Sequence, residues 1–177
     1  CYEVRFDKKA VWIEYAGDFL WELQPGENAL EVRAVNLYGI RGVVNKDMTC
    51  ELALDIGKAW GTYLHRFSSK PHVVIGTDAR LSNQMLKTSV IGGLLSTGCN
   101  VMDIGLVPTP ALQYVVKKKH FDSGIVITAS HNPPEFNGIK GIDGDGTEFS
   151  KVTEEKIESI FFNRESWLYN IALVNFT

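Results

Sequence analysis

The stretch TASHNPP at residues 128–134 places a hydroxyl and an imidazole next to each other, at Ser130 and His131. Both groups can take part in nucleophilic or acid–base chemistry. The preceding run, residues 124–128, is short, apolar and rich in β-branched side chains, which predicts a buried strand. The prolines that follow prevent regular structure from continuing. Ser130 is therefore expected at the end of a buried strand, where α/β folds place their chemistry.

A neighbouring serine and histidine also occur in ordinary turns, so the surrounding stretches matter. Three of them carry residues suited to phosphate binding or loop shaping: EFNGIK (135–140), GTDARLS (76–82) and YGIRG (38–42). An arginine guanidinium binds phosphate through two donors and does not lose its charge. Arg41 in YGIRG can equally be a solvated residue of a glycine-flanked loop. Asp78 and Arg80 can pair and hold their own loop in place.

These four motifs, in the order in which they occur along the chain, resemble domain I of the α-D-phosphohexomutases, the phosphomannomutase/phosphoglucomutase superfamily. The resemblance spans residues 37–162. It implies that Ser130, in the T-A-S-H-N-P loop, carries a transferable phosphoryl group. It also implies that Tyr38 and Arg41 face the active cleft. One departure from the family pattern is Thr77, which stands where an arginine is usual and so removes one positive charge.

The resemblance implies a mutase that interconverts hexose 6-phosphate and hexose 1-phosphate through a bisphosphate intermediate. The residues that it places at the catalytic or substrate-binding site are Ser130, His131, Lys140, Arg41 and Tyr38. Lys140 and Arg41 are the candidates for proton handling or charge stabilisation during transfer. His131 can instead be a structural turn residue.

Asp78, Arg80 and Asn132 are expected to shape the loop rather than react. The resemblance further implies a Mg²⁺ ion that binds the phosphate carried by Ser130 and is shared with a second domain. Such an ion neutralises the charge that develops during phosphoryl transfer. The partner is a phosphosugar, whose hexose (mannose, glucose or glucosamine) the sequence does not decide.

The pattern of apolar residues predicts an α/β fold, a three-layer α/β/α domain with a mostly parallel sheet, plus an N-terminal β-rich extension. Thr49 is predicted to cap a helix whose apolar face includes Trp60 and Tyr63, as core residues rather than a ligand platform. Ser82 is predicted to cap a helix that runs to Thr97. The remaining predicted elements are strands at 71–76 and 101–105, a helix capped by Thr109 with Pro110 first, a hairpin arm at 137–141 and a helix at 151–162.

Two aspartates separated by glycine, Asp143 and Asp145, raise the question of a metal site. The Mg²⁺ loop of the family belongs to its second domain, so these residues are interpreted as a glycine-rich β-turn.

Residues 1–36 alternate apolar and polar side chains, as antiparallel strands do, and faintly resemble the closing strands of a fibronectin-III sandwich. Residues 163–177 are interpreted as the truncated start of a linker or next domain.

The chain has 177 residues, a net charge of -3 and a pI near 5.8. This balance argues against general binding to nucleic acid or to an anionic membrane surface. Neither a membrane-spanning run nor a signal peptide is evident, and the three cysteines (Cys1, Cys50 and Cys99) lack metal-like spacing. The sequence thus predicts a cytoplasmic protein. Because the chain starts at Cys1 rather than Met, it is interpreted as an excised or processed piece.

Three loops that the family uses for metal, sugar and phosphate binding in its domains II–IV are missing from the sequence, so no appreciable mutase activity is expected of this chain alone. One alternative is a catalytically incomplete fragment or recombined chain that acts only as a folded module. Dependence of fold stability on residues 1–36 would favour it. The other alternative is a serine hydrolase that uses Ser130 and His131, which the absence of a Gly-x-Ser-x-Gly motif disfavours.

Overall fold

The computed structural model of the chain describes residues 2–6, 9–13, 31–32 and 40–163. The chain forms two compact units, Cys1–Asn36 and Leu37–Thr177, each with its own sheet. Tyr38 and residues 164–177 of the predicted linker lie outside the described residues.

The first unit contains a three-stranded antiparallel sheet in the order β2-β1-β3. Its strands are β1 (Tyr2–Phe6), β2 (Lys9–Ile13) and β3 (Glu31–Val32). Val4 lies opposite Val11 on one side and Val32 on the other. The antiparallel pairing predicted from the alternating pattern is therefore present, whereas the fibronectin resemblance stays a prediction.

The second unit is built on a five-stranded sheet in the order β4-β8-β7-β5-β6. The strands are β4 (Ile40–Val43), β5 (His72–Thr77), β6 (Asn100–Leu106), β7 (Ser123–Ile127) and β8 (Phe136–Asp143). β5 runs parallel to β6 and β7, whereas β8 runs antiparallel to both β7 and β4. Four strands thus point one way and only β8 points the other, which confirms a mostly parallel sheet.

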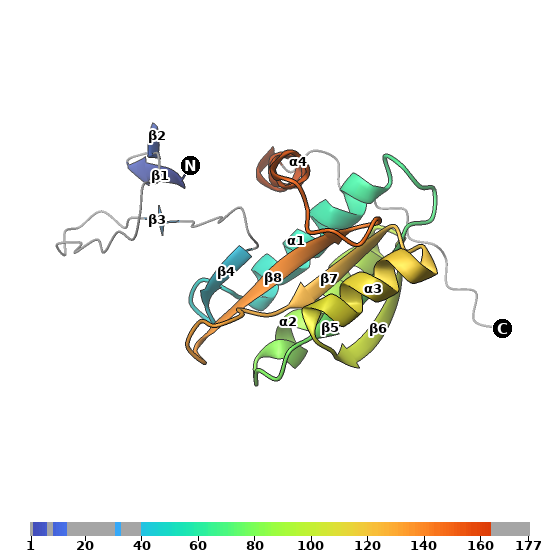
Figure 1. Cartoon of the computed structure of the whole chain (residues 1–177). Helices are drawn as coiled ribbons and strands as arrows, with labels where there is room; N and C mark the ends of the chain where they lie inside the picture. Colours follow the sequence, from blue (N-terminus) through green and yellow to red (C-terminus); the bar gives the residue numbers. More distant parts are fainter. Residues whose placement is uncertain (1, 7–8, 14–30, 33–39, 164–177) are drawn as a thin grey trace. The chain divides into compact units, whose positions relative to one another are not determined.

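Helices cover both faces of this sheet, as Figure 1 shows. They are α1 (Cys50–Leu64), α2 (Asn83–Ser96), α3 (Thr109–Lys119) and α4 (Lys151–Asn163). One buried cluster joins α1, α2 and α4 to one face of the sheet, and a smaller cluster joins α3 to the other. The predicted three-layer α/β/α architecture is confirmed.

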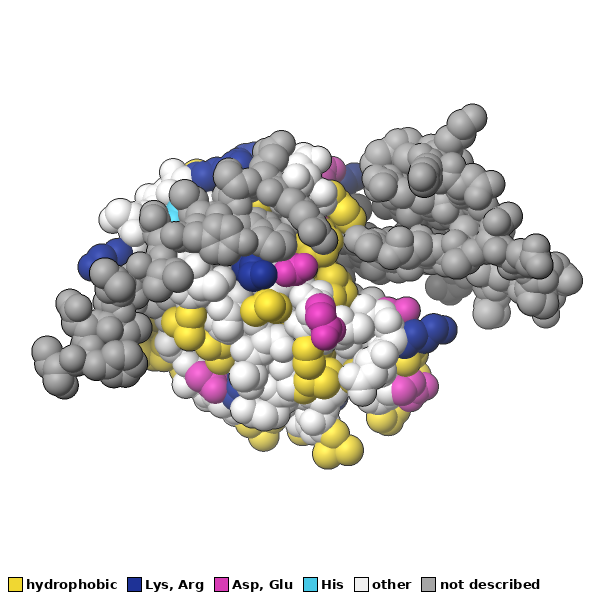
Figure 2. Space-filling model, turned by 180° about the vertical axis from the view of Figure 1, so that it is seen from behind, with side chains coloured by type: hydrophobic (Ala, Val, Ile, Leu, Met, Phe, Trp, Pro, Cys, Tyr) yellow, Lys and Arg dark blue, Asp and Glu magenta, His cyan; other side chains and the backbone are white. Residues whose placement is uncertain are grey.

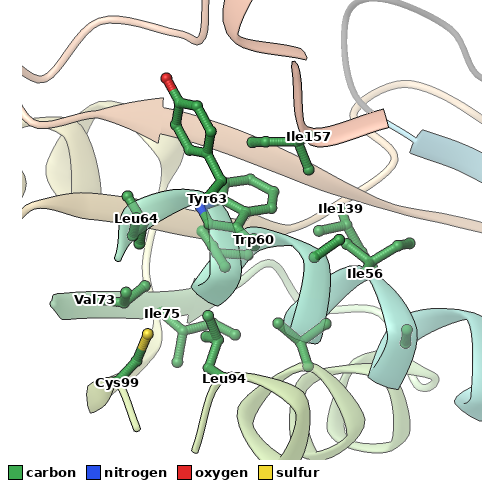
Figure 3. Close-up of a cluster of buried hydrophobic side chains, with 14 of the residues drawn as sticks. Ile56, Trp60, Tyr63, Leu64, Val73, Ile75, Leu94, Cys99, Ile139 and Ile157 are labelled. Carbon is green, nitrogen blue, oxygen red and sulfur yellow. The ribbon is translucent and has the colours of Figure 1, made fainter. Parts of the chain in front are cut away.

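The larger cluster is organised around α1, whose Ile56, Trp60 and Tyr63 are buried against Ile75 and Ile139 of the sheet (Figure 3). The indole nitrogen of Trp60 donates a hydrogen bond to the hydroxyl of Ser123 over 3.1 Å. That hydroxyl in turn donates to the carbonyl of Ile142 over 2.9 Å. The indole nitrogen of Trp60 and the hydroxyl of Ser123 are thus paired, as buried polar atoms usually are. The prediction that Trp60 and Tyr63 are core residues is confirmed.

Two of the three predicted helix caps, Thr49 and Ser82, occupy the N-cap position in the structure. The hydroxyl of Thr49 accepts a hydrogen bond from the amide of Leu52 over 3.2 Å, so this cap is confirmed. Ser82 is the N-cap residue of α2, but its side chain makes no capping hydrogen bond, and its hydroxyl accepts from the side chain of Asn137. The cap of α3 is Pro108, one residue before the predicted Thr109.

The predicted loop at residues 38–42 is wrong over residues 40–42, which belong to strand β4 (Ile40–Val43). These residues pair with the start of β8, with Arg41 opposite Gly138. The partner lies almost a hundred residues further along the chain, so the pairing leaves no local signal.

The predicted turn near Asp143 and Asp145 is confirmed: the amide of Gly146 donates to the carbonyl of Asp143 over 2.8 Å, and the amide of Thr147 donates to a carboxylate oxygen of Asp145 over 2.8 Å.

Figure 2 shows one face of the molecule, on which acidic and basic side chains of the described residues are scattered among hydrophobic ones. Such isolated exposed hydrophobic side chains are normal for folded proteins. No helix in the described part of the chain has the length and apolar character needed to cross a membrane.

Glu154 is a titratable group of α4 whose environment disfavours its charge. Burial is the largest cause that raises its pKa to about 7, Glu158 and Glu148 add to it, and Lys140 opposes it. One carboxyl oxygen is buried without a hydrogen-bond partner. The folded state thus holds a proton on Glu154 that the unfolded state releases near the ordinary glutamate pKa of 4.5. The contribution of this group to stability therefore falls as the pH rises from 4.5 to about 7.

We expect Glu154→Gln to raise the melting temperature more at pH 8 than at pH 5, because the substitution removes a charge that the folded state disfavours only at the higher pH. Thermal unfolding at both pH values, at one ionic strength, measures this difference. Glu135→Gln, at an exposed glutamate before β8, is the control and should show no such difference. An equal gain at both pH values would contradict the assignment.

Gly138 lies where β4, β8 and the end of β7 converge, and no side chain fits there. A Cβ atom at this position would lie 2.6 Å from the carbonyl oxygen of Ile40 and 2.8 Å from both Cγ of Arg41 and the carbonyl oxygen of Thr128. In contrast, a Cβ atom on Gly92 of α2 would make one ordinary contact, at 3.5 Å.

We expect Gly138→Ala to lower the free energy of unfolding by about 1–3 kcal/mol, because backbone atoms must move apart. Gly92→Ala should instead raise it by about 0.5–1 kcal/mol, because alanine is the better helix former. Urea unfolding of the two variants measures both changes. An unchanged free energy of unfolding in Gly138→Ala would show that β4, β8 and the end of β7 are not tightly packed around Gly138.

Candidate functional site

Ser130 lies just beyond the carboxyl end of β7, as predicted. All five residues of β7 are buried, and the strand ends at Ile127. The amide of Asp78, just after β5, donates to the carbonyl of Ile127 over 3.1 Å, and the amide of Thr128 donates to the carbonyl of Gly138 in β8 over 2.9 Å. The buried end of β7 is thus fixed on both sides, and Ser130 itself is exposed.

The backbone of Ser130 adopts a left-handed conformation, with a φ of 54°. This conformation costs a residue with a side chain roughly 1–2 kcal/mol and persists only where its surroundings enforce it. One constraint is local: the amide of Ser130 donates to the hydroxyl of Thr128 over 3.0 Å. The other constraints come from the loop that follows β5.

Asp78 is the acceptor at the centre of that loop. Its carboxylate accepts hydrogen bonds from the Thr128 hydroxyl (2.7 Å), the Asn83 side chain (2.7 Å), and the amide (3.0 Å) and Nε (3.3 Å) of Arg80. Burial acts to raise the pKa of Asp78, but these bonds and the charge of Arg80 outweigh it and hold the pKa below the ordinary value. The carboxylate is therefore charged at neutral pH.

Arg80 reaches from the same loop to the backbone around Ser130. Its Nη1 donates to the carbonyls of Pro133 (2.7 Å) and Phe136 (2.8 Å), and its Nη2 donates to those of Ser130 (3.0 Å) and Asn132 (2.7 Å). The expected pairing of Asp78 with Arg80 is present, but most of the donors of Arg80 serve the loop that carries Ser130.

Two buried asparagines complete this arrangement, and neither was predicted from the sequence. The amide group of Asn137 donates to Ser82 and Asn83 over 2.8 Å each, and its oxygen accepts from the backbone of Gly138 over 2.8 Å. The side-chain amide of Asn83 in turn donates to the backbone carbonyl and the carboxylate of Asp78. One signal was available: an asparagine within a strand must find partners for its amide when it is buried.

Arg41 is connected to the loop through Asn132, whose side-chain oxygen accepts from Nη1 over 3.1 Å. Lys140 stands two residues beyond Gly138, the partner of Arg41, so both side chains lie on the same face of the β4–β8 pair. The ammonium of Lys140 forms a salt bridge with Glu148. The structure thus brings Arg41 and Asn132 to the loop, and gives Lys140 an acidic partner of its own.

His131 is exposed, with its Nδ1 3.4 Å from the hydroxyl of Ser130. This distance is at the long end for a hydrogen bond. In serine hydrolases an acid orients the histidine, but no carboxylate of residues 40–163 is hydrogen-bonded to His131. Asp78, the acid of this loop, is bound to Thr128, Arg80 and Asn83 instead. The geometry does not favour the hydrolase alternative.

Comparison with known proteins gives a consistent assignment. The family model described as "Phosphoglucomutase/phosphomannomutase, alpha/beta/alpha domain I" matches residues 33–167. A phosphoglucomutase/phosphomannomutase of Thermococcus kodakarensis is 49% identical over 129 residues, which are 72% of this chain and 28% of the relative. A phosphoglucosamine/phosphogalactosamine mutase of Sulfurisphaera tokodaii is 50% identical over 124 residues, 70% of this chain and 27% of the relative.

A solved structure supports the same conclusion. The crystal structure of a phosphoglucomutase/phosphomannomutase family protein from Burkholderia thailandensis superimposes with a TM-score of 0.65 at 32% identity, over 72% of this chain and 29% of that chain. The chain thus spans somewhat more than a quarter of the length of these relatives. With the matched region covering the whole α/β/α unit, the chain belongs to the phosphoglucomutase/phosphomannomutase family and contains its domain I.

Proposed function

We propose that Ser130 carries the phosphoryl group of a mutase that interconverts hexose 6-phosphate and hexose 1-phosphate. The observation that supports this most directly is the conformation of Ser130: an exposed hydroxyl on a left-handed residue, held by Thr128 and Arg80 at the end of a buried strand. Relatives named for glucosamine, galactosamine, glucose and mannose phosphates indicate a hexose phosphate as the substrate class.

The proposed step forms a bond between Oγ of Ser130 and phosphorus, and breaks the bond between phosphorus and an oxygen of the hexose bisphosphate. The proton of the hydroxyl leaves, and the sugar oxygen gains one. His131, whose Nδ1 is 3.4 Å from Oγ, is the nearest candidate to accept the proton. Lys140, whose ammonium is paired with Glu148, is proposed to stabilise charge on the transferred group. Arg41, which keeps its charge, is proposed to bind phosphoryl oxygens, and Tyr38 to contact the sugar.

A Mg²⁺ ion is part of this proposal because the family resemblance implies one. Among the described residues there is no group of three or more His, Cys, Asp or Glu side chains that could hold it. The chain would contribute the phosphoryl oxygens on Ser130, and a second domain the remaining ligands. When bound, the ion neutralises charge on the phosphoryl group.

We expect the chain to accept one phosphoryl group on Ser130 when it is incubated with glucose 1,6-bisphosphate and Mg²⁺. Intact mass before and after incubation, followed by peptide mapping, measures the gain and its position. Ser130→Ala should show no gain, because the acceptor oxygen is absent. Ser69→Ala, at an exposed serine in the loop after α1, is the matched control and should behave as wild type.

Two results would count against the proposal. Phosphate that maps to another residue, or that persists in Ser130→Ala, would remove Ser130 from the reaction. No phosphate on a chain shown by circular dichroism to be folded would favour the alternative, in which this chain is a folded module without chemistry of its own. Mutase turnover is not expected of this chain alone, because the family places sugar recognition in other domains.

A further inference from the structure

The guanidinium of Arg80 has no hydrogen-bond donor left for a ligand. An arginine side chain offers five N–H donors. In Arg80 the Nε donor binds Asp78, the two Nη1 donors bind Pro133 and Phe136, and the two Nη2 donors bind Ser130 and Asn132. The side chain is only 13% exposed. A phosphate could reach this guanidinium only by displacing one of its present partners.

The four carbonyls that Arg80 binds belong to a segment, residues 130–136, in which two prolines reduce the number of backbone donors. Pro133 and Pro134 have no N–H group, so the segment cannot form a regular ladder. Within it, the amide of Asn132 donates to Ala129 over 3.0 Å and that of Phe136 to Pro133 over 3.1 Å. The carbonyls of Ser130, Asn132, Pro133 and Phe136 all accept from Arg80, which therefore fixes the path of the chain from Ser130 to the start of β8.

Arg41 differs from Arg80 in this respect. Within residues 40–163 its guanidinium makes one hydrogen bond, from Nη1 to Asn132. Within that part of the chain, the other donors of Arg41 bind no protein group, whereas all five donors of Arg80 do. The two arginines near Ser130 have distinct tasks, although both carry the same charge.

We infer that Arg80 is a positioning residue, which holds the Ser130 hydroxyl in place for phosphoryl transfer through backbone carbonyls alone and does not bind the substrate phosphate. Asp78 orients the guanidinium through Nε and, through Thr128, also fixes the amide of Ser130. The inference rests on the proposed role of Ser130 as phosphoryl acceptor. It assigns the effect of Arg80 to the rate of transfer and not to substrate affinity.

The test measures the rate of phosphoryl uptake by the whole chain at a series of glucose 1,6-bisphosphate concentrations. Arg80→Lys and Arg80→Ala should lower the maximal rate roughly 100-fold, as expected for a reacting group displaced by about an ångström. The half-saturating concentration should not change. Lysine should not rescue, because its point charge cannot bind four carbonyls in one plane. Arg66→Ala, at an exposed arginine after α1, should behave as wild type.

Arg41→Ala provides the contrast, since it should raise the half-saturating concentration. A wild-type rate in Arg80→Lys, or a raised half-saturating concentration with an unchanged maximal rate, would overturn the inference, because either result is that of a phosphate-binding charge. If Arg80→Ala does not fold, Arg80→Lys, which keeps the side-chain stem and the charge, carries the test.

Amide hydrogen exchange separates this inference from the proposed function. In Arg80→Lys, peptides covering residues 128–137 should exchange faster than in wild type, whereas those from α3 (Thr109–Lys119) should not change. If wild type takes up no phosphoryl group, the function proposed for Ser130 fails in this chain, and exchange alone decides whether Arg80 holds the loop. Unchanged exchange at residues 128–137 would overturn the inference whatever the kinetics.

Discussion

The ion pair between Asp78 and Arg80 connects the ends of three strands of the sheet through hydrogen bonds. The pair lies in the loop after β5, and its hydrogen bonds reach Thr128 after β7 and Phe136 at the start of β8. A largely buried guanidinium is costly unless its donors are satisfied. Here a carboxylate and four carbonyls satisfy them, so the charge that stabilises the loop is itself stabilised by the loop.

The antiparallel direction of β8 makes this connection possible. Successive parallel strands must be joined by a long crossover, whereas antiparallel neighbours can be joined directly. Because β8 reverses direction, its first residue lies at the same edge of the sheet as the last residue of β7. The segment that carries Ser130 is therefore short, closed at both ends by strand pairing, and within reach of a single arginine side chain.

Much of this architecture could be predicted from the sequence, because its signals are local. The apolar β-branched run of β7, the Thr49 cap and the glycine-rich turn at Asp143 each depend on neighbouring residues. The failures have non-local causes. The hydroxyl of Ser82 binds the distant Asn137 and not an amide of α2, and the stretch around Arg41 forms a strand because β8 pairs with it. The carbonyl partners of Arg80 left no trace in the sequence, since every residue has a carbonyl.

The contacts that hold Ser130 join residues about fifty positions apart, in the case of Arg80, and about ninety, in the case of Arg41 and Asn132. Such contacts exist only once the strands of the sheet have assembled in their native order. Before that, Ser130 is one hydroxyl among many, with no left-handed backbone to present it. On the role proposed here, phosphoryl occupancy of Ser130 would report the fraction of chains that have reached the native state. The covalent mark would thus record correct folding of the chain.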